Sequence, residues 1–184
     1  GRPTVEVDVR LERGVRGRGV APAGASRGAF EAIDRRDGGT RFGGFDVERA
    51  LNGIRTEIAP ALIGLDARDQ RLVDTTLIQL DGTPNKARLG GNATVALSMA
   101  VLRAAAAAEG LPLWRFLAAG RPVRLPLPEV QIFGGGAHAG RRVDIQDFLV
   151  MPVGAQSFSE ALEMVWNVYA AAGALMAAKG PLTG

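Results

Sequence analysis

Three polar side chains that could form a site follow a run of glycines in the second half of the chain. His138 is the only histidine and comes directly after Gly134-Gly135-Gly136-Ala137, while Gln146 and Asp147 interrupt an otherwise apolar stretch. Glycine lets a backbone bend sharply or approach a ligand because it has no Cβ. A carboxylate in a buried strand costs several kcal/mol unless it is paired or functional. The pattern is typical of a binding or catalytic site.

Each of these residues also has a purely structural interpretation. His138 could be an ordinary surface histidine on a loop, and Asp147 could belong to a buried ion pair with one of the arginines. Neighbouring strand residues point to opposite faces, so Gln146 and Asp147 share a site only if the strand end is irregular. The sequence contains no Walker A, dinucleotide-binding, HExxH or nucleophile-elbow motif.

The composition excludes several classes of function. Net charge is +3, but the arginines are scattered among acids and form no cluster with aromatics, which argues against nucleic acid. No uninterrupted apolar run approaches about 18 residues, so we expect no membrane span. Cysteine is absent, which excludes disulfides and thiol chemistry and fits a cytoplasmic protein.

The first half of the chain reads as strands followed by helices. Val5, Val7 and Val9 alternate with charged residues, which predicts a half-buried strand over residues 4–11, and a second strand over 15–21 completes a hairpin. The small residues that follow predict either a lid or an ordinary connection. Helical periodicity then predicts helices over approximately 46–60, 66–81, 92–109 and 113–119.

Two details of these helices are specific predictions. Asp46 is the expected N-cap of the first helix. The expected core face of the third helix consists of Val95, Met99, Leu102 and Ala106.

The pattern of strands and helices starts again in the second half of the chain. Three prolines within residues 121–128 predict a linker and a domain boundary, which divides the chain into domains 1–124 and 125–184.

Short strands over 129–133 and 144–151 precede a helix over 157–179, opened by Ser157 and Glu160 as a capping box. The expected inward face of that helix is Leu162, Val165, Tyr169, Ala172 and Met176. Because two strands and a helix cannot bury themselves, they predict the opening of an α/β barrel of about eight such units. We therefore expect a fragment of a longer protein.

Six segments, in order along the chain, resemble the enolase (phosphopyruvate hydratase) family: GRPTVEVDV, APAGASRGAFEA, EIAPALIGLDARDQRLVD, LIQLDGTPNKARLGGNA, AAAAEGLPLWRFLAAG and GGGAHAGRRVDIQDFLVMPVGAQSFSEAL. The resemblance implies an α+β capping domain, with a three-stranded meander and helices, followed by a modified (β/α)8 TIM-type barrel. It also implies a cytoplasmic homodimer or higher oligomer and a Mg²⁺-dependent lyase. That glycolytic enzyme interconverts 2-phosphoglycerate and phosphoenolpyruvate.

The resemblance assigns roles to individual residues. Ala25 and Ser26 match the first flexible loop, whose serine binds the second of two Mg²⁺ ions when it closes on substrate. His138 matches a histidine of the second mobile loop near the substrate phosphate, and Gln146 matches a glutamine of the substrate pocket. Asp147 stands where the family has a glutamate that assists the acid side of the reaction. The base lysine, the principal acid and the three carboxylates of the first metal site are implied beyond Gly184.

Departures from the family pattern lie near this site, at Arg27, Phe30, Glu129, Gln131, Gly134 and Asp147. Asp147 is one methylene shorter than glutamate, and misplacement by about 1 Å can cost about a hundredfold in rate. These changes leave two alternatives to enolase itself. One is a paralogue that acts on another phosphorylated or phosphonylated carboxylic acid, as in phosphonate biosynthesis. The other is a non-catalytic fragment that only binds.

Overall fold

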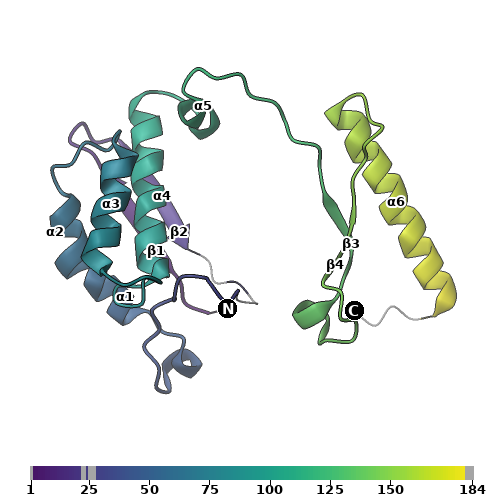
Figure 1. Cartoon of the computed structure of the whole chain (residues 1–184), viewed down its shortest axis with the longest axis horizontal. Coiled ribbons are helices and arrows are strands. Elements are labelled where there is room, and N and C mark those ends of the chain that lie inside the picture. The colour runs from purple at the N-terminus through teal and green to yellow at the C-terminus, as the bar shows by residue number, and fades with distance from the viewer. Residues whose placement is uncertain (1, 22–23, 25–27, 181–184) are drawn as a thin grey trace. The chain divides into compact units, whose positions relative to one another are not determined.

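The computed structural model describes residues 2–21, 24 and 28–180, which form two units. Unit 1 comprises Gly1–Arg121 and unit 2 comprises Pro122–Gly184 (Figure 1). This division falls at the start of the proline-rich segment, slightly before the boundary expected after Arg124.

Unit 1 begins with the predicted hairpin. Strands β1 (Val5–Arg10) and β2 (Arg16–Ala21) pair antiparallel, with Val5 opposite Ala21. Val5 is fully buried, whereas the alternate residue Asp8 is exposed and forms an ion pair with Arg18 at 2.8 Å. The alternation therefore separates an inner face from a charged outer face, as the sequence indicates.

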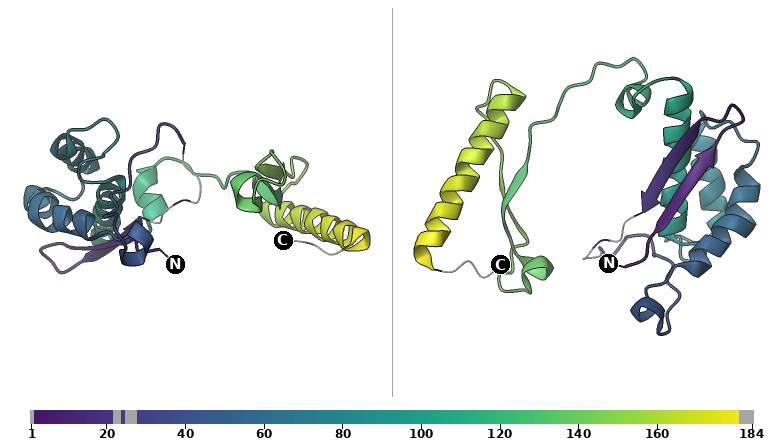
Figure 2. Two further views of the ribbon diagram at one scale, coloured as in Figure 1. Left: turned by 90° about the horizontal axis from the view of Figure 1, so that it is seen from below. Right: turned by 180° about the vertical axis from the view of Figure 1, so that it is seen from behind.

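Helix α4 (Gly91–Ala108) covers the inner face of this hairpin (Figure 2). The contact is close because β2 presents glycines: a Cβ on Gly19 would lie 1.9 Å from the carbonyl oxygen of Ala96, and one on Gly17 would lie 2.2 Å from the backbone nitrogen of Ala104. The expected core face was therefore wrong in part. Small residues point inward, and Val95 remains 48% exposed. The side chains buried along the helix include Ala93, Ala96, Leu97, Ala100, Val101 and Ala104.

The remaining helices of unit 1 pack on α4 or on one another. Helices α1 (Glu48–Gly53) and α2 (Ala59–Leu62) are joined by the π-helical turn η2 (Ile54–Ile58), and α3 (Gln70–Asp81) and α5 (Leu113–Ala118) follow. A short 3₁₀ turn, η1 (Arg41–Gly44), precedes them. The core includes Val5, Val47, Ile58, Val73, Leu77 and Leu97.

The predicted N-cap of α1 was wrong. The carboxylate of Asp37 accepts hydrogen bonds from the backbone N–H groups of Glu48 (2.8 Å) and Arg49 (2.9 Å). Asp46 is buried instead and forms an ion pair with Arg41 at 3.0 Å. A helix N-terminus accepts any carboxylate that reaches its free N–H groups, including one from a distant loop.

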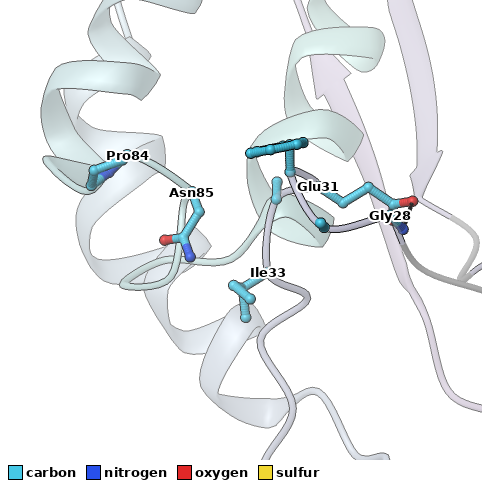
Figure 3. Close-up of a pocket in the computed structure, with 8 residues that line it drawn as sticks. Gly28, Glu31, Ile33, Pro84 and Asn85 are labelled. Atoms are coloured by element: carbon cyan, nitrogen blue, oxygen red, sulfur yellow. Dashed lines mark hydrogen bonds between the residues drawn. The ribbon is translucent and has the colours of Figure 1, made fainter.

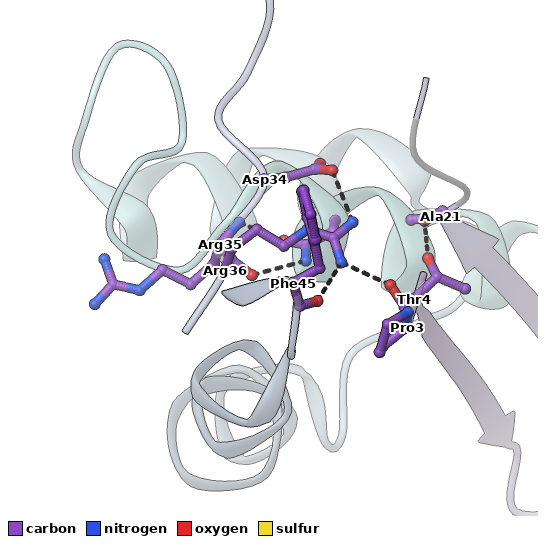
Figure 4. A network of polar contacts seen from close by, with 8 residues as sticks. Pro3, Thr4, Ala21, Asp34, Arg35, Arg36 and Phe45 are labelled. Carbon is purple, nitrogen blue, oxygen red and sulfur yellow. Dashed lines mark hydrogen bonds and ion pairs between the residues drawn. The ribbon is translucent and has the colours of Figure 1, made fainter. Parts of the chain in front are cut away.

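The sheet of unit 1 has two strands within the described residues, whereas the resemblance implies three. The segment after the hairpin makes its backbone hydrogen bonds elsewhere: the Ile33 N–H donates to the Asn85 carbonyl (2.8 Å), and the Ile33 carbonyl accepts from the Gly91 N–H (2.7 Å). Arg36 then joins this segment to the residues just before β1 and just after η1, by donating to the carbonyls of Pro3 (2.6 Å) and Phe45 (2.8 Å) (Figure 4).

The described part of unit 2, up to Gly180, contains two β-strands and one α-helix. Strands β3 (Val130–Gly134) and β4 (Asp147–Val150) pair antiparallel, with a bulge between Gln131 and Phe133. Helix α6 (Phe158–Lys179) is capped by Ser157, whose hydroxyl accepts from the Glu160 N–H at 3.1 Å.

The expected inward face of α6 is largely exposed. Ala161 and Val165 are the buried residues of this helix, while Leu162, Tyr169 and Met176 are each at least 40% exposed. A two-stranded hairpin offers too little surface to cover one side of a 22-residue helix. By length and composition alone, α4 and α6 could each cross a membrane. Most of α4, however, is buried in unit 1, as in the core helix of a globular domain.

Candidate functional site

The loop between β3 and β4 is folded tightly by its glycines. The Gly135 N–H donates to the Gln146 carbonyl at 2.6 Å, and the Gly136 N–H donates to the Val143 carbonyl at 2.8 Å. A Cβ on Gly135 would lie only 2.0 Å from the carbonyl oxygen of Ile145. Glycine is needed there because the two arms of the loop touch through their backbones. The last residue of the loop, Gln146, therefore lies beside the end of β3, where the loop begins.

Asp147 lies at the start of β4, and carboxamide groups contact both of its oxygens. The Gln146 side-chain amide donates to Asp147 Oδ2 at 3.0 Å, and the Gln131 amide donates to Asp147 Oδ1. The Gln146 and Asp147 side chains are therefore in contact, because Gln146 precedes the regular strand and its side chain can turn towards its neighbour. The alternative of a buried ion pair was wrong, since Asp147 is exposed.

His138 lies in the same loop, on the 3₁₀ turn η3 (Gly136–Ala139). Its side chain is exposed. Within the described residues, the hydrogen bonds join Gln146 to Asp147 but not to His138. The structure thus brings Gln146 and Asp147 into contact, and places His138 on the 3₁₀ turn of the same loop.

Gln131 is the residue of this group that sequence reasoning did not identify as functional. It was noted only as a departure from the family pattern. In the structure, the hairpin register places Gln131 opposite Leu149, on the same face of β4 as Asp147. That register could not be read from two short strands separated by an irregular loop.

The other predicted residues, Ala25 and Ser26, lie outside the described residues, as does Arg27. The segment that follows them lines a pocket of about 310 Å³ together with Pro84 and Asn85 (Figure 3). Glu31 closes a turn there by accepting from the Gly28 N–H at 2.6 Å. Phe30, where the family has a histidine, is fully exposed.

The loop that carries Pro84 and Asn85 is held by a buried carboxylate. Asp81, which is 2% exposed, accepts from the Leu89 N–H (2.8 Å) and the Thr83 N–H (3.0 Å), and also from the Thr83 hydroxyl. Burial is the largest single influence and raises the pKa of Asp81, but these hydrogen bonds and the positive charge of Lys86 together outweigh it and lower the pKa below its usual range. This loop in turn anchors Ile33 through Asn85.

The described part of the chain contains no binding site for the Mg²⁺ ions that the resemblance implies. No group of three or more His, Cys, Asp or Glu side chains gathers there in a way that could hold a cation. Mg²⁺ needs several oxygen ligands, and Asp147, the carboxylate of the site, has both oxygens engaged by amides. The described residues therefore do not fit a magnesium site.

Comparisons with known proteins cover nearly the whole chain. The family described as "Enolase, N-terminal domain" matches residues 1–117, and "Enolase, C-terminal TIM barrel domain" matches residues 122–183. A protein named Enolase from Acidothermus cellulolyticus is 50% identical over 184 residues, which are 100% of this chain and 43% of that protein. Enolase 1 of Desulfitobacterium hafniense is 52% identical over 170 residues, covering 92% of this chain and 39% of that protein. The chain spans about two-fifths of the length of these relatives.

Proposed function

Because the chain belongs to the enolase family, with its capping domain followed by the start of its barrel, we propose that the protein is a lyase that reversibly dehydrates 2-phosphoglycerate to phosphoenolpyruvate in glycolysis. The observation that carries this proposal is the 50% identity to a protein named Enolase across every residue of the chain. The matched residues include the glycine loop and the strand that follows it, so the compared region contains the candidate site as well as the core.

The proposed roles of the described residues follow from their chemistry. His138 is exposed and can donate to a phosphate oxygen. Asp147 is the exposed carboxylate that would assist removal of the hydroxyl group, and the Gln146 amide fixes one of its oxygens at 3.0 Å. Ala25 and Ser26 would contact the substrate from the first loop, as the resemblance implies.

Two Mg²⁺ ions are part of this proposal as cofactors. When bound, Mg²⁺ would supply electrostatic stabilisation of the negative charge that develops on the substrate carboxylate. Ser26 would be a ligand of the second ion, and the main ligands would come from outside this sequence. We further propose a cytoplasmic homodimer or higher oligomer, whose substrate is a small phosphorylated carboxylic acid.

Activity of the full-length protein tests the proposal. Purified enzyme with Mg²⁺ and 2-phosphoglycerate should form phosphoenolpyruvate, and chelation of Mg²⁺ should abolish the reaction. Ser26→Ala should raise the Mg²⁺ concentration needed for half-maximal rate, whereas Ser159→Ala, at an exposed position of α6, should not. Failure of the parent enzyme to form phosphoenolpyruvate at any Mg²⁺ concentration would refute the proposed function.

A second candidate is a paralogue that acts on another phosphorylated or phosphonylated carboxylic acid. The observation in its favour is the unusual carboxylate site, where a shorter acid than the family glutamate is held by two carboxamides. Assay of the same protein with a phosphonate analogue of 2-phosphoglycerate distinguishes the two candidates. Faster turnover of the phosphonate than of 2-phosphoglycerate would favour the paralogue, and turnover of neither would favour a binding role.

A further inference from the structure

Gln131 and Asp147 contact each other diagonally across the β3–β4 hairpin. The register pairs Gln131 with Leu149 and Gly134 with Asp147, so Gln131 and Asp147 are not direct partners. Diagonal neighbours on one face of an antiparallel pair have Cα atoms about 7–8 Å apart, a span that long side chains can bridge. Gln131 bridges it, and its amide reaches Asp147 Oδ1. Asparagine at position 131 would be one methylene too short.

Gly134 provides the space in which this amide lies. A Cβ on residue 134 would be 3.1 Å from Gln131 Nε2, closer than an ordinary van der Waals contact. The backbone of Gly134 does not have a positive φ, so its conformation does not require glycine. Space for the Gln131 side chain is therefore the physical reason that the structure offers for glycine at this position.

The two amides together define the orientation of the Asp147 carboxylate. Gln131 on β3 donates to Oδ1, and Gln146 in the loop before β4 donates to Oδ2, so the two oxygens are engaged from opposite sides of the hairpin. A carboxylate with a single hydrogen bond can still rotate about its Cβ–Cγ bond, whereas donors to both oxygens fix the plane of the group. A fixed plane matters for catalysis because small errors in placing a proton-transfer group reduce the rate strongly.

We propose that Gln131 is a positioning residue for Asp147, and that Gly134 makes its approach possible. The inference rests on the proposed function, in which Asp147 assists the acid side of the dehydration. It also explains why three departures from the family pattern occur in one chain. Gln131, Gly134 and Asp147 form one contact group, in which the Gln131 amide and the absent side chain at residue 134 accompany an acid that is shorter than the family glutamate.

The proposal can be tested in the full-length enzyme by shortening the side chain of residue 131 and lengthening that of residue 147, each by one methylene. Gln131→Asn should lower kcat by about 10- to 100-fold with little change in KM, since substrate binding is retained while the acid is misplaced. Asp147→Glu alone should also lower kcat, because its carboxylate would meet the Gln131 amide that already lies against residue 147. Gln131→Asn combined with Asp147→Glu restores the summed side-chain length, and should recover kcat to within about threefold of the parent.

Two further variants separate positioning from folding. Gly134→Ala should lower kcat because its Cβ displaces the Gln131 amide, and Gln79→Asn, at an exposed position of α3, should leave kcat unchanged. Unchanged kcat in Gln131→Asn would overturn the proposal. So would a double variant no more active than the singles, because a merely structural role would not be rescued by exchanging the methylene.

Failure of the positioning role can be distinguished from failure of the proposed function. If the parent enzyme fails to convert 2-phosphoglycerate, the proposed function fails, and crystal structures of the parent and of Gln131→Asn then decide on the contact. A carboxylate plane at Asp147 that rotates when Gln131 is shortened supports the positioning role. The same plane in both structures overturns it.

Discussion

Gly19 and Ala96 are in contact through their backbones, so that a Cβ on Gly19 would lie 1.9 Å from the Ala96 carbonyl oxygen. The hairpin and α4 can approach this closely because one presents glycine and the other alanine. The separation between the two layers of unit 1 is thus set by the absence of side chains. A rigid backbone cannot move away from an added methyl group as the end of a flexible side chain can.

Gly19→Ala should therefore destabilise the protein severely. We expect a loss of about 3 kcal/mol or more in the free energy of unfolding, because the methyl group overlaps backbone on the facing helix. Urea unfolding of the parent and the variant measures this. Gly173→Ala in α6 is the matched control, since a Cβ there meets nothing within 4 Å, and it should be neutral or stabilising by up to about 1 kcal/mol. Equal urea midpoints for parent and Gly19→Ala would contradict the account.

Asn92→Ala should also be destabilising. Asn92 is 1% exposed, and its side chain accepts from the Arg35 N–H (2.9 Å) and donates to the Arg35 carbonyl (3.1 Å). Removing it leaves both backbone groups without these partners, which should cost about 1–3 kcal/mol per unsatisfied group. Urea unfolding again measures the loss. Asn52→Ala, at an exposed position of α1, should change the urea midpoint little. If Asn52→Ala lost as much stability as Asn92→Ala, the importance of the Asn92–Arg35 hydrogen bonds would be contradicted.

The stability of unit 1 should fall in acid because of Asp81. Its pKa is lowered in the folded state, so its contribution is present above the unfolded pKa of about 3.9 and is lost as the pH falls through the lower folded value. Chemical unfolding between pH 7 and pH 2 should show this loss below about pH 4. In Asp81→Asn, stability should be lower at neutral pH and less dependent on pH in that acid range. Glu12→Gln, in the exposed hairpin turn, should keep the pH dependence of the parent.

His138→Ala should impair use of a phosphorylated substrate. A hydrogen bond to a charged group contributes about 1.5–3 kcal/mol, so loss of one to the substrate phosphate should lower kcat/KM by about 10- to 150-fold. Steady-state kinetics with 2-phosphoglycerate measures this. Because His138 is exposed, the thermal midpoint should not change, and unaltered kcat/KM would remove His138 from the proposed site.

Local patterns in the sequence determined much of the secondary structure. Alternating valines predicted β1, and Ser157 with Glu160 predicted the start of α6, because side-chain periodicity and capping depend on residues only a few positions apart. The glycine loop was recognised in the same way. The family resemblance added the expected site residues, of which Gln146 and Asp147 are in contact in the structure.

Only the tertiary structure decided which distant residues complete these local elements. The cap of α1 comes from Asp37, the inward face of α4 is set by glycines on β2, and the second amide on Asp147 comes from Gln131 on the neighbouring strand. Each of these contacts joins positions at least ten residues apart. Such pairs are chosen by strand register and layer spacing, which result from the packing of the whole unit and leave no periodic pattern in the sequence.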